Sequence, residues 1–131
     1  IGKSFTVLNS NEKEVIILSF GSLLDSAIQA GNNLNARVVD MRFIKPIDLK
    51  LLEEINNIYK LIVTLEDNVV AGGAGSAVNE YLIKLNSKSS ILNLGLPDQF
   101  IEHGDQEQQK LLNGLDGNGV EKSIQEKLKL I

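Results

Sequence analysis

Short apolar runs recur along the chain, and polar or glycine-containing segments separate them. Their lengths are typical of β-strands, so we predict five strands, at residues 3–8, 15–20, 36–39, 60–65 and 91–94. The run at 15–20 is apolar almost throughout, as expected of a parallel strand that is covered on both faces. The first run alternates instead, with Phe5 and Val7 on one face, and a short polar turn follows it. We therefore expect a hairpin in which the first strand pairs antiparallel at an edge of the sheet.

Segments with helical spacing lie between these strands. Ser22 and Asp25 match a capping box at the start of the first segment, and Gly31 with the asparagines after it is expected to end that helix. Asp48, two residues after Pro46, is the expected N-cap of the second helix. The third helix is predicted from the spacing of its apolar residues, which are Ala74, Ala77, Val78, Tyr81, Leu82 and Leu85.

The C-terminal part of the chain carries two further helical patterns. Asp105 and Gln108 form a capping pair for a short helix that ends near Gly114. Residues 116–119 are Asp, Gly, Asn and Gly, and we interpret them as a loop. The final helix is predicted from one apolar face, made by Val120, Ile124, Leu128 and Ile131.

The alternation of strand and helix from the second strand onward indicates the architecture. Each strand–helix–strand unit favours a right-handed crossover between parallel strands. We therefore predict the α/β class, as a three-layer α/β/α sandwich around a five-stranded, mostly parallel sheet with one antiparallel edge strand. A length of 131 residues fits a single domain over residues 1–131.

Composition excludes several classes of protein. The formal net charge of −4 argues against a nucleic-acid-binding surface, which needs clustered Lys and Arg. No apolar run is long enough to span a membrane and the N-terminus has no signal-peptide pattern, so we expect a cytoplasmic protein. The absence of Cys excludes disulfides and thiolate metal sites. The chain begins with Ile1 rather than Met, so we expect it to be part of a longer protein.

A glycine-rich turn, with Gly72, Gly73, Gly75 and Ser76, joins the fourth strand to the third helix. It has the first two glycines of a dinucleotide-binding fingerprint, but Val78 occupies the third glycine position and most of the sheet precedes it. A tight strand-to-helix turn is therefore the favoured interpretation. The glycines would leave amide N–H groups free at the helix start, where an anion or a partner's carboxylate could bind.

Glu66 and Asp67 follow a central strand at its carboxyl end, where open α/β sheets place their sites. Two acids there could bind a metal ion or act as acid and base. Adjacent residues of a strand point to opposite faces, however, so these two cannot jointly hold one ion without a turn between them. We favour a structural role, in which they interact with a nearby helix dipole or pair with a neighbouring domain.

The connection after the third strand mixes charged and bulky apolar residues, among them Asp40, Arg42, Phe43 and Lys45. It is either the roof of the domain's own core or an interface, and the two alternatives have equal weight. His103, the single histidine, stands in a polar loop and is expected to be solvated. Residues 116–119 lack the ligand spacing of a calcium loop. These patterns assign no catalytic, cofactor-binding or metal-binding residue.

Three segments together resemble the 1-deoxy-D-xylulose-5-phosphate synthase family. Residues 39–48, 66–80 and 94–104 are similar to its motifs DMRFxKPLD, EENxxxGGAGSxVNE and GLPDxFIxxG, in the same order. The resemblance covers essentially the whole chain. The second motif is shared more loosely with transketolases and 2-oxo-acid dehydrogenases, whereas the first and third point to the synthase. Glu66 and Asp67 replace the more usual pair of glutamates and His103 falls at a variable position, so neither is given a catalytic role.

The resemblance implies the C-terminal, transketolase-like domain of a longer homodimeric enzyme of non-mevalonate isoprenoid synthesis, which condenses pyruvate with glyceraldehyde 3-phosphate and releases carbon dioxide. Thiamine diphosphate and Mg2+ would serve the whole enzyme, and the family keeps their binding motifs in the preceding domains. This domain would then contact the preceding domains and the homodimer partner, and alone it would bind neither cofactor. The alternatives are the corresponding domain of another transketolase-like enzyme or 2-oxo-acid dehydrogenase, and a free-standing module that binds an anionic ligand at residues 72–75.

Overall fold

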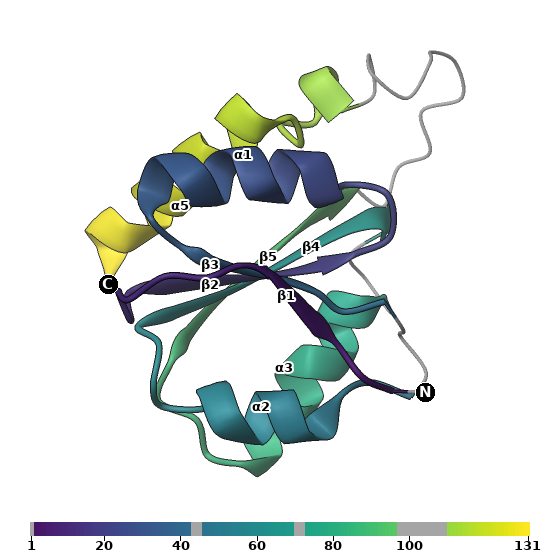
Figure 1. Ribbon diagram of the computed structural model, residues 1–131, viewed down its shortest axis with the longest axis vertical. Helices are drawn as coiled ribbons and strands as arrows, with labels where there is room; N and C mark the ends of the chain where they lie inside the picture. The colour runs from purple at the N-terminus through teal and green to yellow at the C-terminus, as the bar shows by residue number, and fades with distance from the viewer. Residues whose placement is uncertain (1, 43–45, 70–72, 97–109) are drawn as a thin grey trace.

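The computed structural model describes residues 2–42, 46–69, 73–96 and 110–131. One sheet has the strand order β1-β3-β2-β4-β5, in which β1 is antiparallel to β3 and the other neighbours are parallel (Figure 1). The strands are β1 (Phe5–Leu8), β2 (Val15–Phe20), β3 (Arg37–Asp40), β4 (Leu61–Val69) and β5 (Ser90–Leu96). The helices are α1 (Leu24–Leu34), α2 (Leu49–Ile55), α3 (Ala74–Lys84) and α5 (Gly117–Leu130). The predicted α/β class and the single antiparallel edge strand are confirmed.

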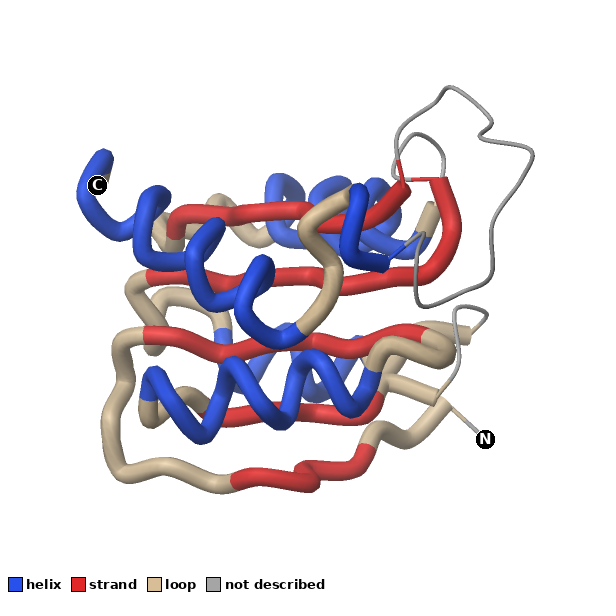
Figure 2. Tube along the Cα trace, turned by 90° about the horizontal axis from the view of Figure 1, so that it is seen from above, coloured by secondary structure: helices blue, strands red, loops and turns tan. Residues whose placement is uncertain are grey.

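Helices cover both faces of the sheet, so the molecule has three layers (Figure 1). α1 and α5 lie on one face, where Val15 and Ile17 of β2 enter the first core cluster. α2 and α3 lie on the other face, where Ile16 and Leu18 enter the second. All residues of β2 are buried, which confirms that this strand is covered on both sides. Figure 2 shows the strands lying side by side, with α1 running along them.

The first strand lies at a sheet edge, as expected, but the predicted hairpin is wrong. β1 pairs with β3 and not with β2, because β2 already has a parallel neighbour on each side. A register shift between Thr6 and Leu8 also breaks the predicted alternation. As a result Val7 and Leu8 both pack against the first core cluster, while Phe5 is 62% exposed.

α1 differs from the prediction at both ends. It begins at Leu24 without a side-chain cap, so the expected capping box does not form. Gly31 does not end the helix; it is buried in the last turn, where an added Cβ would collide with Val38 Cγ2. Asn35 takes the left-handed conformation at the C-cap, with φ of 55°, a role that Asn fills well because its side chain tolerates this region.

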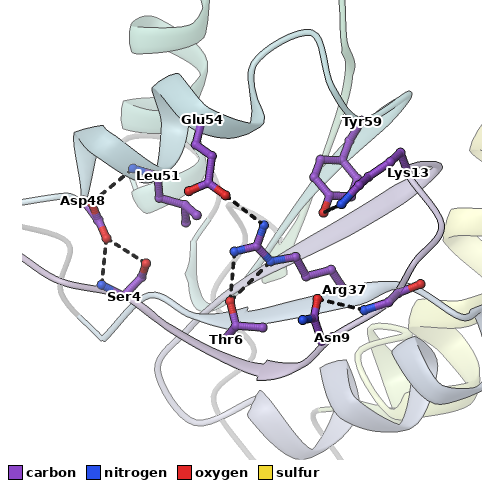
Figure 3. A network of polar contacts seen from close by, with 10 residues as sticks. Ser4, Thr6, Asn9, Lys13, Arg37, Asp48, Leu51, Glu54 and Tyr59 are labelled. Atoms are coloured by element: carbon purple, nitrogen blue, oxygen red, sulfur yellow. Dashed lines mark hydrogen bonds and ion pairs between the residues drawn. The ribbon is translucent and has the colours of Figure 1, made fainter.

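Polar side chains attach the N-terminal segment to the sheet and to α2 (Figure 3). Ser4 donates from its amide N and its Oγ to Asp48 Oδ2, over 2.9 and 2.7 Å. The Arg37 guanidinium donates from Nη2 to Thr6 Oγ1 over 2.9 Å. Asp48 Oδ1 accepts from Leu51 N over 3.2 Å, which confirms Asp48 as the N-cap of α2. Partial burial raises the pKa of Asp48, but the hydrogen bonds from Ser4 and Leu51 outweigh burial and hold that pKa below its ordinary value.

Two further predictions need correction. Residues 116–119 are not a loop, because Asp116 caps α5 by accepting a hydrogen bond from Gly119 N over 3.2 Å and the helix starts at the next residue. β4 extends to Val69, four residues beyond the predicted end at 65, so Glu66 and Asp67 lie within the strand. The capping pair expected at Asp105 and Gln108 lies outside the described residues. Within the described ranges, no helix has the length and apolar character to cross a membrane.

Candidate functional site

At the carboxyl edge of the sheet, β2 and β4 form a topological switch point, which is where open α/β sheets have their crevice. β2 and β4 are neighbours with Phe20 opposite Glu66, yet the chain leaves β2 for α1 on one face and leaves β4 for α3 on the other. Open α/β sheets bind ligands at such a point, where successive connections turn to opposite faces. The side chains at the ends of β2 and β4 therefore decide whether this chain can bind a ligand there.

Glu66 occupies the α3 side of this crevice. Its side chain is fully buried and accepts hydrogen bonds from Ala74 N to Oε1 over 3.0 Å and from Gly75 N to Oε2 over 2.7 Å. Both donors belong to the first turn of α3, where the helix dipole favours negative charge. Burial nevertheless raises the pKa of Glu66 above its ordinary value, since the two amide bonds offset only part of the desolvation. Two of the amides that were predicted to be free for an external anion, those of Ala74 and Gly75, therefore donate to the chain's own carboxylate.

Asp67 occupies the opposite side. Its Oδ2 accepts from Ser22 N over 3.0 Å and from Ser22 Oγ over 2.7 Å, in the turn that leads into α1. A Cβ on Gly21, which has φ of +88°, would lie 2.6 Å from Asp67 Oδ1, so the turn and the carboxylate approach closely. The expectation that the two acids face opposite sides of the sheet is confirmed. Each supports the start of a different helix, and they do not form a joint metal-binding pair.

We expect Asp67→Ala to lower the free energy of unfolding by about 1 kcal/mol, because a charged acceptor with two donors is removed from a solvent-accessible turn. Ser22→Ala removes the hydroxyl donor, and the double variant should cost less than the sum of the two single variants. Urea denaturation of the four proteins measures this coupling. Asp25→Ala, an exposed change in the first turn of α1, is the control. Strict additivity of Asp67 and Ser22 would show that their contact contributes nothing to stability.

A partly buried polar network that the sequence analysis missed lies under α3. Asn93 of β5 donates from Nδ2 to Thr64 Oγ1 over 2.6 Å, and Asn79 of α3 donates from Nδ2 to Asn93 Oδ1 over 2.7 Å. Asn79 Oδ1 is buried without a hydrogen-bond partner. The network lies directly beneath the first turn of α3, since a Cβ on Gly75 would be 2.8 Å from Thr64 Oγ1. Polar residues within two otherwise apolar strands were the signal that could have revealed it.

Those of the other candidate residues that the structure describes lie around the same edge of the sheet. Asp40 ends β3, is half-buried, and accepts a hydrogen bond from Arg42 N over 3.1 Å. Between them Met41 is fully buried in the second core cluster, so this part of the connection is a roof over the domain's own core. Arg42 is exposed, with φ of 64°. Gly73 precedes α3 as its N-cap and Ser76 lies in the first turn, whereas Phe43, Lys45 and Gly72 lie outside the described residues.

The described residues do not fit a magnesium–diphosphate group. Within these ranges no group of three or more His, Cys, Asp or Glu side chains lies close enough together to hold a metal ion. The two acids of the crevice already accept protein hydrogen bonds, and the two first-turn amides of α3 that could bind a phosphate donate to Glu66. Glu66, Asp67 and the first-turn amides of α3 are therefore engaged in contacts that hold the fold together.

Comparison with known proteins identifies relatives that cover most of the chain. Residues 5–120 match the family model described as the transketolase C-terminal domain. The chain is 52% identical over 120 residues to a 1-deoxy-D-xylulose-5-phosphate synthase of Pseudoalteromonas translucida, covering 92% of this chain and 19% of the relative. It is 50% identical over 116 residues to the synthase of Vibrio cholerae, covering 88% of this chain and 18% of that protein. The chain thus spans about a fifth of the length of these curated relatives.

Solved structures show the same fold. A protein described as "split gene transketolase, inactive beta4 tetramer" superposes with a TM-score of 0.85 and 31% identity, covering 98% of this chain and 43% of that one. A transketolase variant from Pichia stipitis superposes with a TM-score of 0.66 at 17% identity, covering 98% of this chain and 18% of that one, which supports the fold alone. The chain belongs to the transketolase C-terminal domain family, and the curated relatives it resembles are 1-deoxy-D-xylulose-5-phosphate synthases.

Proposed function

We propose that this chain is the C-terminal support and interface domain of a cytoplasmic, homodimeric 1-deoxy-D-xylulose-5-phosphate synthase. The whole enzyme condenses pyruvate with glyceraldehyde 3-phosphate and releases carbon dioxide. Identity of about half the aligned residues with synthases supports this reaction over those of other transketolase-like enzymes. The observation that carries the supporting role is the crevice between β2 and β4, where Glu66 and Asp67 hold two helix starts instead of a ligand.

The interface part of the proposal concerns the carboxyl edge of the sheet. Asp40 and Arg42, together with Phe43, Lys45 and residues 72–76, provide the contacts to the preceding domains or to the partner subunit. Arg42 is exposed beside the fully buried Met41. The connection is therefore anchored in this domain at Met41, while the side chain of Arg42 lies at the surface. Arg42→Ala in the full-length enzyme should weaken the dimer or lower the rate of synthesis. Sedimentation and steady-state assays test this, with exposed Lys50→Ala on α2 as the control.

Thiamine diphosphate and Mg2+ belong, in this proposal, to the rest of the enzyme, where thiamine diphosphate supplies the carbanion chemistry. We expect isothermal titration of this chain with thiamine diphosphate and Mg2+ to give no binding heat, and no product to form from pyruvate and glyceraldehyde 3-phosphate. The full-length protein should bind the cofactor and make 1-deoxy-D-xylulose 5-phosphate. Magnesium-dependent binding to this chain alone would contradict the supporting role, and a full-length protein without synthase activity would contradict the enzyme assignment.

A further inference from the structure

An open, mostly apolar groove lies between the start of α2 and the outer side of α3, away from the crevice described above. It has a volume of about 270 Å³, and its apolar lining comes from Pro46, Ile47, Leu49, Ala77 and Tyr81. Leu49 is 46% exposed although it is a large apolar side chain at the first position of α2. The exposed charges of Glu80 and Lys84 complete the lining. An apolar floor with charges beside it is typical of a surface that receives a peptide segment.

The N-terminal segment of the chain runs past one end of this groove. A Cβ added to Gly2 would lie 3.1 Å from Pro46 Cγ, so the backbone of residue 2 runs close to a lining residue. Two residues later, Ser4 is held by its two hydrogen bonds to Asp48, at the N-cap of the same helix (Figure 3). Polypeptide that enters the domain at its N-terminus is therefore held beside the groove.

We propose that the groove binds the polypeptide segment immediately preceding residue 1, which places an apolar side chain against Leu49, Ala77 and Tyr81. This rests on the proposed function, because it requires a chain of the length of the synthases, of which the present residues are about a fifth. Neighbouring helices pack about 8–10 Å apart, and an extended chain advances about 3.3 Å per residue, so three or four upstream residues suffice to cross the groove. The segment would fix the direction in which the preceding domain joins this one.

Thiol labelling tests the proposal well because the chain has no Cys of its own. Ala77→Cys places a thiol in the groove, and Ile83→Cys places one on the same helix at a side chain that is 71% exposed and does not line the groove. Labelling rates are compared in the chain as it stands, in a chain extended upstream by about fifteen residues of its own reading frame, and in the full-length protein. Peptide mapping by mass spectrometry separates these thiols from any others in the longer proteins.

The fifteen-residue extension should already slow labelling at position 77 by about tenfold or more, and should leave position 83 within about twofold. Equal rates at position 77 in all lengths would overturn the proposal. Protection that appears only in the full-length protein would overturn it in favour of a more distant domain, and protection in the short chain that grows with concentration would indicate a second copy. If the full-length protein makes 1-deoxy-D-xylulose 5-phosphate while position 77 stays unprotected, the proposed binding of the segment in the groove is wrong but the proposed function stands. If position 77 is protected in a full-length protein without synthase activity, the proposed function is wrong but the binding of the segment in the groove stands.

Discussion

Replacing Gly75 with valine is expected to leave the chain largely unfolded at 25 °C. A Cβ at this position would lie 2.8 Å from Thr64 Oγ1, 2.9 Å from Asn93 Nδ2 and 3.1 Å from Glu66 Oε2. Thr64 and Asn93 form a hydrogen bond to each other, and Glu66 holds the first turn of α3, so none of the three can withdraw without breaking a buried or partly buried hydrogen bond. Overpacking costs about 1–3 kcal/mol, and losing the Glu66 bonds adds about 1–3 kcal/mol for each buried amide left without a partner. That sum is comparable to the whole stability of a typical domain, about 5–15 kcal/mol.

The matched control is Gly117→Ala at the start of α5. A Cβ there would also meet close atoms, the nearest being Gln29 Oε1, but these belong to the end of an exposed, flexible side chain that can rotate away. We expect this variant to change stability by less than about 1 kcal/mol, and Gly75→Ala to lie between the control and Gly75→Val. Circular dichroism at increasing urea concentration measures all three. A Gly75→Val protein that unfolds at the urea concentration of the parent would show that α3 shifts freely over β4 and β5.

The fold class was predictable because the chain's local patterns agree with one another. The buried run at 15–20, the apolar spacing of α3 and the cap at Asp48 each indicated the element that the structure contains. The errors occurred where tertiary contacts decide which strands pair and which side chains cap a helix. β1 crosses to β3 because both edges of β2 are already paired, which a local turn pattern cannot reveal. Ser22 leaves its expected capping role because Asp67, distant in sequence, offers a charged acceptor.

The candidate site was predictable only in part. The two-residue period of a strand was enough to place Glu66 and Asp67 on opposite faces, as the structure shows. Which groups they contact was not predictable, because that depends on where β4 ends and how the chain returns to α3. The prediction of free amides at the turn considered the helix start alone. In the structure the amides of Ala74 and Gly75 donate to Glu66, which lies eight and nine residues before them in the chain. A buried acid at the end of a strand is thus a reason to ask which helix start lies beside it.

Glu66→Ala is expected to have the largest effect among the charged residues at the ends of β2 and β4, with a loss of about 2–6 kcal/mol in the free energy of unfolding. The substitution leaves the amides of Ala74 and Gly75 buried without an acceptor, and each such donor costs about 1–3 kcal/mol. Glu66→Gln keeps one carbonyl oxygen and should cost less, whereas Glu80→Ala, an exposed acid on α3 itself, should change stability by less than about 0.5 kcal/mol. Urea denaturation at pH 7 ranks the three variants. Equal stability of Glu66→Ala and the parent would show that water replaces the carboxylate at the helix start.

The pH dependence of the free energy of unfolding, compared between the parent and Glu66→Gln, tests the burial of Glu66 independently. Burial raises the pKa of Glu66 in the folded chain above its ordinary value, so between the unfolded and folded pKa values the native state binds more protons than the unfolded state. The contribution of Glu66 to stability is therefore greatest below its unfolded pKa and falls as the pH rises through the folded pKa. Asp48, whose pKa is lowered, acts in the opposite direction and is common to both proteins, so it cancels in the comparison. The free energy of unfolding of the parent minus that of Glu66→Gln should thus decline from acid toward neutral pH and then level off. If this difference rises over the same range instead, the amides of α3 stabilise the ionised carboxylate by more than burial destabilises it.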